Sequence, residues 1–552
     1  MLGLDRRIDT LNFKESQTEQ KLRGGYYTPG DLADFLARWV AKKDPQSVLE
    51  PSCGDGVFLN KIASACDNPD VLGFEIDNDE ACKAYECATA SGLKNINIQN
   101  SDFLGWAIDA IEKEKVVFDA VLGNPPFIRY QYLPSLFQER AEQIFKKLGC
   151  KFTKHTNAWV PFVLASFALL RPGGRLAMVV PTEVLHVMHA SSLRTFLGKE
   201  ARQLVIIDPE ELWFPGTLQG AVLLLAEKKR GPRDKAKGLG IYPVRGREFI
   251  KIDPDELFNA PRHINGKTIE GKWTRALVDP STLELLDGLL EEKAIRRFND
   301  IAKVDVGIVT GANKFFLVHD KTIQQFGLEQ WAHPMFGRSD HCPGVIYDKD
   351  QHRENAKNGK PTNFLWFQDT SVEKNPKGMA YIQQGETDKL HTRYKCRIRK
   401  PWYEVPSVYS TEVGMLKRSH NAPRLILNKL QAYTTDTAYR IRIKEGSANQ
   451  LVFNFVNSLT ALSAELEGRF YGGGVLELVP SEIERLLIPT AANIPEDVQG
   501  LDKAIRSLPM DLVLEQQSKI ILSTLGLSAC EQDNILSAWN KLRSRRQRVP
   551  SK

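Results

Sequence analysis

Short apolar runs alternate with polar turns and helix-like segments along roughly the first 245 residues of the chain. Runs typical of buried strands occur at 47–50, 71–77, 96–98 and 119–123, and an apolar-periodic helix from Val57 to about Ala65 follows the first of them. Glycine, acidic or amide residues follow these runs, as is usual where strands end. This order of strands and helices predicts an open α/β sheet, in which ligands bind at the carboxyl ends of the strands.

The strand at 119–123 stops at Asn124-Pro125-Pro126-Phe127. Two consecutive prolines cannot donate ladder hydrogen bonds, so the strand must end there and leave nearby carbonyl groups free for a ligand. The amide oxygen of Asn124 and the carbonyl of Pro125 offer two acceptors for the two hydrogens of an exocyclic amine. Phe127 offers its face to the ring that carries the amine. The alternative is a Pro-Pro turn with a capping Asn124 and a core Phe127.

The turns after the first three strands carry residues suited to a nucleoside-like ligand. Gly54 and Gly56 allow a ligand to approach the backbone closely, although the spacing fits neither a phosphate-binding loop nor the dinucleotide fingerprint. Glu75, at the end of the second strand, could accept both ribose hydroxyls, and Asp102 and Phe103 after the third suit an adenine amino group and ring. Each has an ordinary alternative: Glu75 and Asp102 as helix caps, Phe103 as core. Four successive units that deliver such residues at one edge favour a binding site.

Taken in order, these motifs resemble those of gamma-class N6-adenine DNA methyltransferases of the TaqI type, over roughly residues 24–228. The resemblance implies a Rossmann-like domain that binds S-adenosyl-L-methionine and methylates a flipped-out adenine in duplex DNA. By that resemblance the cofactor-binding residues are Thr28, Glu50, Pro51, Cys53, Gly54, Gly56, Glu75, Asp102 and Phe103. The catalytic residues are Asn124, Pro125, Pro126 and Phe127, and the target base stacks between Phe127 and Phe214. Phe127 stands where relatives often have Tyr, which keeps the stacking ring but removes a hydroxyl.

The implied reaction needs few protein groups. Adenine N6 is a poor nucleophile because its lone pair is delocalised into the ring, and hydrogen bonds to Asn124 and the Pro125 carbonyl favour a pyramidal, more reactive amine. No dedicated base is expected, since the product loses its proton after transfer. Because N6 is hydrogen-bonded within a duplex, the base must leave the helix at a cost on the order of a few kcal/mol, which stacking offsets.

Changes in pattern divide the rest of the chain. We expect a catalytic domain at 1–245, a junction at 246–300, a mixed α+β target-recognition domain at 301–490, and a helical segment with a basic tail at 491–552. Leu451–Leu466 is typical of a helix. The cofactor loop precedes the tetrapeptide, an order that resembles the gamma class. Only about two dozen residues precede the opening motif, so we expect no fused nuclease and methylation without cleavage, as by the modification enzyme of a restriction-modification or defence system.

Composition suggests a partner and argues against several kinds of site. A net charge of +6 with a pI of about 8.7 mildly favours a polyanionic partner. Cations and aromatics interleave at 391–403, and this stretch either binds DNA or forms a solvated strand face. Its DNA-binding candidates are Arg393, Lys395, Arg397, Arg399 and Lys400. Eight cysteines without CxxC pairs, and His186 and His189 without a third ligand, argue against a metal site. The scattered cysteines, the polar amino terminus and the lack of a long apolar run predict a cytoplasmic protein with no membrane partner, and the family resemblance implies a prokaryotic source.

Other functions stay open from the sequence. Protein glutamine-N5 and RNA guanine-N2 methyltransferases use an Asn-Pro-Pro-aromatic tetrapeptide on the same fold, but they are usually shorter. A non-catalytic DNA-binding subunit would also keep the fold, although the intact Asn124 and Glu75 argue against it. Double-stranded DNA is the expected substrate. A separate restriction endonuclease encoded nearby is a candidate partner.

Overall fold

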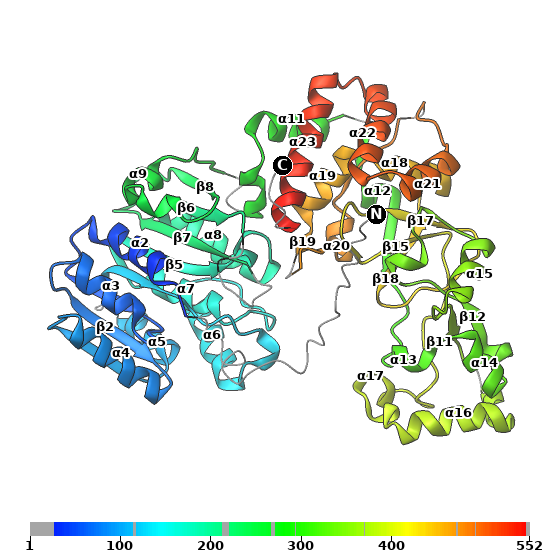
Figure 1. The fold of residues 1–552 in the computed structure, drawn as a ribbon, viewed down its shortest axis with the longest axis horizontal. Helices are drawn as coiled ribbons and strands as arrows, with labels where there is room; N and C mark the ends of the chain where they lie inside the picture. The colour runs from blue at the N-terminus through cyan, green and yellow to red at the C-terminus, as the bar shows by residue number, and fades with distance from the viewer. Residues whose placement is uncertain are drawn as a thin grey trace, which may run out of the picture. The chain divides into compact units, whose positions relative to one another are not determined.

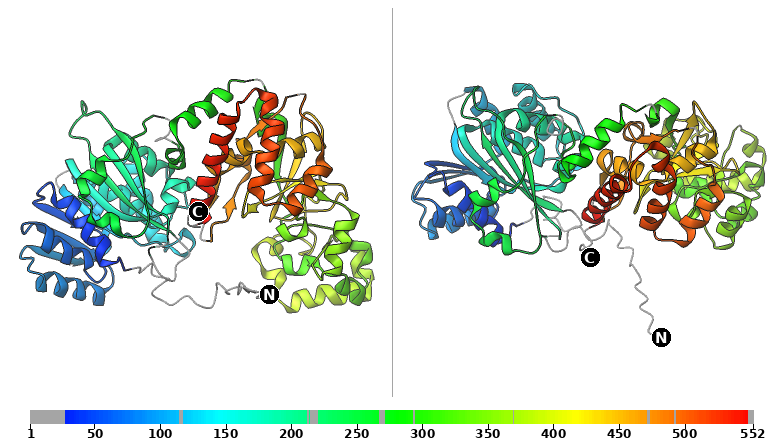
Figure 2. Two further views of the ribbon diagram at one scale, coloured as in Figure 1. Left: turned by 45° about the horizontal axis from the view of Figure 1, so that its top comes forward. Right: turned by 90° about the horizontal axis from the view of Figure 1, so that it is seen from above.

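The computed structural model describes residues 27–113, 117–211, 213, 220–266, 271–292, 294–368, 370–470, 473–491 and 493–547. The chain forms two compact units that divide between Leu277 and Val278, within the stretch expected as a junction. The first unit is a sheet with helices on its faces, and the second combines several small sheets with many helices (Figures 1 and 2).

The first unit is built on an eight-stranded sheet in the order β3-β2-β1-β4-β5-β7-β6-β8. From β3 to β5 neighbouring strands are parallel, whereas β7 runs antiparallel to both β5 and β6. The strands are β1 (Ser47–Glu50), β2 (Asp70–Glu75), β3 (Ile96–Asn100), β4 (Phe118–Gly123), β5 (Leu170–Pro181), β6 (Ala201–Pro209), β7 (Ala221–Lys228) and β8 (Gly238–Val244). This is a Rossmann-like sheet, so the fold class expected from the sequence is confirmed.

Helices cover both faces of this sheet because its strands are apolar on both sides. Successive residues of β5 alternate between two cores: Ala177 and Val179 face one, and Met178 and Val180 the other. Helices α2 (Gly30–Ala41), α3 (Val57–Ala65) and α4 (Asn78–Ala90) contribute to the first core. Helices α5 (Phe103–Lys113), α6 (Ser135–Lys147), α7 (Trp159–Ala168) and α8 (Ser191–Glu200) contribute to the second. Helix α9 (Pro254–Asn259) follows β8.

The second unit contains a five-stranded sheet in the order β10-β18-β15-β17-β13 and three smaller sheets, β11-β14-β12, β16-β20-β19 and β21-β9. The strands are β9 (Ile295–Arg297), β10 (Ala302–Val306), β11 (Leu317–Val318), β12 (Ala332–Pro334), β13 (Ile346–Tyr347), β14 (Asn363–Leu365), β15 (Val413–Leu416), β16 (Arg418–Ser419), β17 (Leu425–Asn428), β18 (Ala438–Ile443), β19 (Arg469–Phe470), β20 (Leu476–Glu477) and β21 (Leu487–Pro489). Its helices up to residue 397 are α11 (Pro280–Leu289), α12 (Phe298–Ile301), α13 (Asn313–Phe316), α14 (Asp320–Phe326), α15 (Lys349–Lys357), α16 (Pro376–Thr387) and α17 (Tyr394–Arg397).

The prediction of one helix at Leu451–Leu466 is wrong in one respect. The structure has two helices there, α18 (Ala448–Phe455) and α19 (Ser458–Glu467). The break lies at Asn457, whose backbone is extended and whose side-chain oxygen accepts a hydrogen bond from the Thr460 N–H. Asn is among the preferred residues at a helix start, so it begins a new helix within a continuous apolar pattern.

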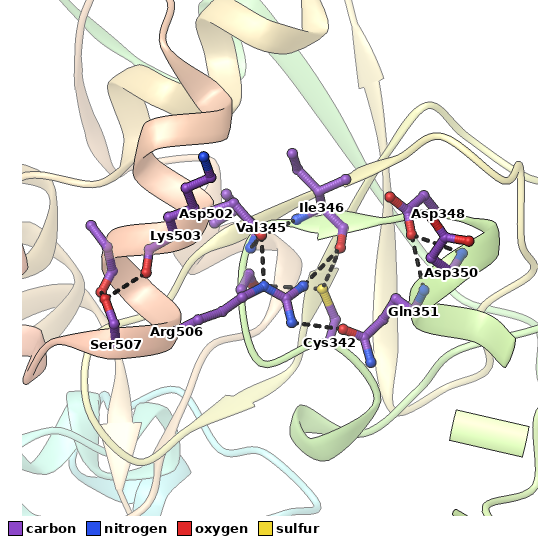
Figure 3. A network of polar contacts seen from close by, with 12 residues as sticks. Cys342, Val345, Ile346, Asp348, Asp350, Gln351, Asp502, Lys503, Arg506 and Ser507 are labelled. Carbon is purple, nitrogen blue, oxygen red and sulfur yellow. Dashed lines mark hydrogen bonds and ion pairs between the residues drawn. The ribbon is translucent and has the colours of Figure 1, made fainter. Parts of the chain in front are cut away.

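Helices α20 (Pro480–Ile483), α21 (Val498–Ser507), α22 (Met510–Ile521) and α23 (Ala529–Gln547) end the described chain. Helix α21 is fixed to strand β13 (Figure 3). Asp502 Oδ1 accepts hydrogen bonds from the N–H groups of Val345 and Ile346, at 2.7 and 2.9 Å. Arg506 donates to Asp502 and to the Gln351 side chain. The carboxyl-terminal helices are therefore part of the second unit.

Candidate active site

A cavity of about 790 Å³ in the first unit is lined by residues from four consecutive strand ends. Its lining includes Thr28, Pro51, Cys53, Gly54, Glu75, Asp102, Phe103, Asn124 and Pro126. These residues are up to nearly 100 positions apart, and the parallel strands β1 to β4 bring them to one edge of the sheet. The volume lies in the range of small-molecule binding sites.

The turn after β1 requires glycine. Gly54 and Gly56 have φ values of +52° and +87°, in the left-handed region that favours glycine. A Cβ on Gly56 would lie 2.9 Å from the Cα of Ala84, so the turn packs directly against helix α4. This close packing holds the start of helix α3 next to the cavity.

Glu75 is held in place by backbone groups at the end of β2. Its Oε2 accepts from the Gly54 N–H at 2.9 Å, and its Oε1 accepts from the N–H groups of Ile76 and Asp77. The cap of helix α4 is Asp77, whose side chain accepts from two N–H groups of the first turn. Glu75 is therefore not the helix cap, and its carboxylate lines the cavity in a fixed orientation.

Asp102 combines a capping role with an ion pair. Its Oδ2 accepts from the Gly105 N–H at 2.8 Å, at the start of α5, and from Arg140 of α6 at 2.6 Å. Phe103 is 2% exposed and packs against Phe74 and Phe162, so it belongs to the core as well as to the cavity lining. Asp102 is therefore a helix cap and Phe103 a core residue, as the alternative interpretation of the sequence had it, and both also line the cavity.

The tetrapeptide after β4 is linked to the opening motif. The Asn124 amide donates to the Thr28 hydroxyl at 3.1 Å, and the Asn124 carbonyl accepts from the Ser52 hydroxyl at 3.0 Å. Asn124 and Pro126 line the cavity, whereas Pro125 is buried. Phe127 is partly buried, packs against both cores and is not among the described residues that line the cavity.

Phe214, the second expected stacking residue, lies outside the described residues.

Glu50, at the end of β1, is completely buried. Within the described part of the chain, neither of its carboxylate oxygens has a hydrogen-bond partner. Burial, together with the charges of Asp55 and Glu75, raises the pKa of Glu50 well above its usual value. Burial also raises the pKa of the Cys53 thiol. An unsatisfied buried carboxyl group is costly, and such groups concentrate at functional sites.

Two residues that the sequence reasoning missed hold the segment after the tetrapeptide. The Asn157 side chain accepts from the Tyr130 N–H and donates to Glu183 Oε2, at 3.1 and 3.2 Å. The adjacent Ala158 N–H donates to the Ile128 carbonyl. Burial raises the pKa of Glu183 to about 7, against the opposing effect of Arg129. An acid two residues after the end of the apolar strand β5 was the available signal for this contact.

The basic stretch at 391–403 is not a strand. It consists of a 3-10 turn at Leu390–Thr392, helix α17 and a segment that leads back into the core. Arg399 donates to the carbonyls of Val309 and Thr310, so its guanidinium is used within the protein. Arg393, Lys395, Arg397 and Lys400 are exposed.

No group of histidine, cysteine or acidic side chains that could hold a metal ion occurs among the described residues. No helix in the described part of the chain is long and apolar enough to cross a membrane.

Two family profiles match the chain. The profile described as "N-6 DNA Methylase" matches residues 11–240, and "Type II methyltransferase M.Eco57I, C-terminal domain" matches residues 270–522. Each match is nearly confined to one of the two units.

Individual proteins are similar over most of their length. The type II methyltransferase M.AccI of Acinetobacter calcoaceticus is 25% identical over 478 residues, which cover 83% of this chain and 84% of that protein. The type II methyltransferase M.XamI of Xanthomonas campestris pv. amaranthicola is 22% identical over 491 residues, covering 85% and 86%. Among solved structures, the type IIG restriction endonuclease BpuSI aligns with 96% of this chain and 67% of its own, at 14% identity and a TM-score of 0.42.

Proposed function

Since the chain carries an N-6 DNA methylase domain and is an adenine-specific DNA methyltransferase, we propose that it is a gamma-class enzyme of the TaqI type that uses S-adenosyl-L-methionine. The observation that carries the proposal is that the cofactor-type residues and Asn124 line the same cavity. The order of motifs, with the cofactor loop before the tetrapeptide and the large second unit after both, supports the gamma class.

The residues that line the cavity, and Glu50 behind it, fit S-adenosyl-L-methionine. Glu50 is not among the described residues that line the cavity, but it directly precedes the lining residue Pro51. Its buried carboxylate oxygens have no hydrogen-bond partner in the described chain, which suits the cationic ammonium group of a methionine. Glu75 Oε1 already accepts two backbone N–H groups, whereas Oε2 accepts only one and keeps a lone pair for a ribose hydroxyl. Asp102 uses only Oδ2 for its bonds to Gly105 and Arg140, which leaves Oδ1 for an adenine amino group. The cofactor, when bound, supplies a sulfonium methyl carbon that an amine can attack.

Asn124 prepares the target amine for this attack. Its Nδ2 donates to the Thr28 hydroxyl, which orients the amide group. In the proposed complex the amide oxygen accepts one N6 hydrogen and the Pro125 carbonyl accepts the other. These bonds favour a pyramidal nitrogen with a localised lone pair. Phe127, and Phe214 beyond the described residues, would stack on the flipped base, which requires Phe127 to move from its present packing.

The second unit, as the target-recognition domain, would bind the DNA around the target base. Its exposed cations Arg393, Lys395, Arg397 and Lys400 are suited to phosphate contacts. A nuclease active site is not part of this proposal, so any cleavage in such a restriction-modification system would belong to a separate endonuclease.

The test is methyl transfer from labelled S-adenosyl-L-methionine to duplex DNA, RNA and release-factor protein, followed by nucleoside mass spectrometry. We expect N6-methyladenine in duplex DNA, and uncut DNA when magnesium is present. Labelling of RNA guanine or of a protein glutamine instead would refute the substrate, and double-strand breaks would refute methylation without cleavage.

The matched variants are Asn124→Ala and, as control, Asn97→Ala at an exposed position of strand β3. The first should abolish transfer and leave cofactor binding nearly intact, whereas the second should behave as wild type. An unchanged rate in Asn124→Ala would remove the proposed mechanism.

A further inference from the structure

Helix α17 and the residue that follows it in the second unit present two large apolar side chains to solvent. Tyr394 and Ile398 are 63% and 62% exposed, and a spacing of four residues places them on the same side of a helical turn. Cys396, between them in sequence, is completely buried, so the opposite side of the turn faces the core. Helices α16 and α17 lie at the end of this unit away from α22 and α23 (Figure 1).

The turn is anchored on both sides of these exposed residues. Arg399 donates to the Thr310 and Val309 carbonyls at 2.8 and 2.6 Å. Gly311 approaches so closely that a Cβ there would lie 2.7 Å from the Cβ of Lys395. Trp402, three residues after Arg399, is in the aromatic core of the unit. The fold therefore holds Tyr394 and Ile398 outward in a defined position.

The segment of chain that carries these side chains is basic. Residues 389–400 contain six lysines and arginines and no acidic residue. Lys395 Nζ and Arg397 Cζ each lie 5.5 Å from the centre of the Tyr394 ring. An aromatic and an aliphatic side chain within such a group of cations match a duplex, where apolar base surfaces lie between rows of phosphates. A protein partner would need an acidic face around an apolar pocket.

We propose that Tyr394 and Ile398 contact the bases of duplex DNA while Lys395 and Arg397 hold the neighbouring phosphates. The inference rests on the proposed function, because it takes DNA as the substrate. It adds which side chains contact the bases and so recognise the sequence, and which bind only the phosphates. It also assigns Arg399 a different role: that residue positions the turn through the Val309 and Thr310 carbonyls.

The experiment measures binding of the full chain to two fluorescent duplexes over a range of salt concentrations. One duplex carries the recognition sequence found by methylation mapping, and the other a scrambled sequence. Tyr394→Ala and Ile398→Ser should each weaken binding to the specific duplex by about 5- to 150-fold, the range for loss of a base contact. The scrambled duplex and the salt dependence should be nearly unaffected.

Lys395→Gln and Arg397→Gln should instead weaken both duplexes alike and lower the slope of log affinity against log salt by about 1 each. The matched controls are Tyr85→Ala on α4 of the first unit and Ile520→Ser on α22, whose native side chains are 52% and 40% exposed. Both controls should bind as wild type, and all variants should keep the wild-type unfolding temperature.

The inference is overturned if Tyr394→Ala and Ile398→Ser bind the specific duplex as wild type, or if they weaken both duplexes equally with a changed salt slope. Loss of binding to a co-purified endonuclease with unchanged DNA binding would also overturn it, in favour of a protein interface. A wild-type chain that binds but does not methylate DNA would refute the proposed function. The specific duplex would then be selected by binding from a random-sequence pool, and the same variants would still distinguish base contacts from phosphate contacts.

Discussion

Substitution of Glu50 by Gln tests whether the buried carboxyl at the end of β1 serves a cationic ligand. Glu50 is completely buried, and within the described chain its carboxylate oxygens have no hydrogen-bond partner. Gln has nearly the same shape but cannot ionise, so the variant removes the charge with little change in packing. We expect it to separate stability from binding, by making the free protein more stable and the complex weaker.

The stability effect has a definite dependence on pH. Burial and the nearby charges raise the pKa of Glu50 in the folded protein above its usual 4.5, so between those two values the folded state binds more protons than the unfolded state. Wild-type stability therefore falls as pH rises above about 4.5, by up to about 1.4 kcal/mol per pH unit from this group alone. Above the folded pKa the loss levels off.

Urea unfolding of both proteins at several pH values, with and without S-adenosylhomocysteine, measures these effects. The stability of Glu50→Gln relative to wild type should rise with pH, and its affinity for the ligand should be about 10- to 150-fold lower, as for loss of one charged hydrogen bond of about 1.5–3 kcal/mol. Glu86→Gln, at an exposed position of α4, is the control and should change neither quantity. A stability difference that is constant with pH, or unchanged ligand affinity, would refute the reasoning.

Three further substitutions address the site and its support. Arg140→Ala removes the ion pair that orients Asp102, and because both side chains are partly exposed, stability should change by less than about 1 kcal/mol. Calorimetry should show a several-fold weaker affinity for S-adenosylhomocysteine. An unchanged affinity would contradict this role of Arg140. Gly56→Ala places a Cβ against Ala84 at a positive φ, so the urea midpoint should correspond to a loss of about 1–3 kcal/mol; a neutral result would mean that the turn relaxes freely. Asp502→Ala leaves two backbone N–H groups of the β13 region without their acceptor. The free energy of unfolding of the second unit, measured by thermal unfolding, should fall by about 1–3 kcal/mol. Ligand binding in the first unit should stay as in wild type.

The first unit could be predicted closely because its signals are local. Strand β1 and helix α3 have the bounds that the apolar pattern predicts, since a buried strand, a glycine turn and an amphipathic helix each depend on neighbouring residues. The contact of Asn157 with Glu183 could not be found in this way, because it joins residues 26 positions apart that belong to different elements.

The second unit was predicted less well. The interleaved cations and aromatics at 391–403 fit a strand face or a DNA-binding segment equally, and the structure has a short helix there because Cys396 and Trp402 turn inward while Arg399 caps neighbouring carbonyls. These are long-range contacts that a periodic pattern does not contain. The break at Asn457 was likewise hidden inside an apolar run, where only the capping propensity of one residue marked it.

The most direct test of the central claim is nucleoside analysis of duplex DNA methylated by the wild-type chain and by Asn124→Ala. Both proteins should bind S-adenosylhomocysteine, since Asn124 is assigned to the target amine. The account predicts N6-methyladenine from the wild type and none from the variant. Equal amounts of N6-methyladenine from both proteins, or a methylated base other than adenine from the wild type, would contradict it.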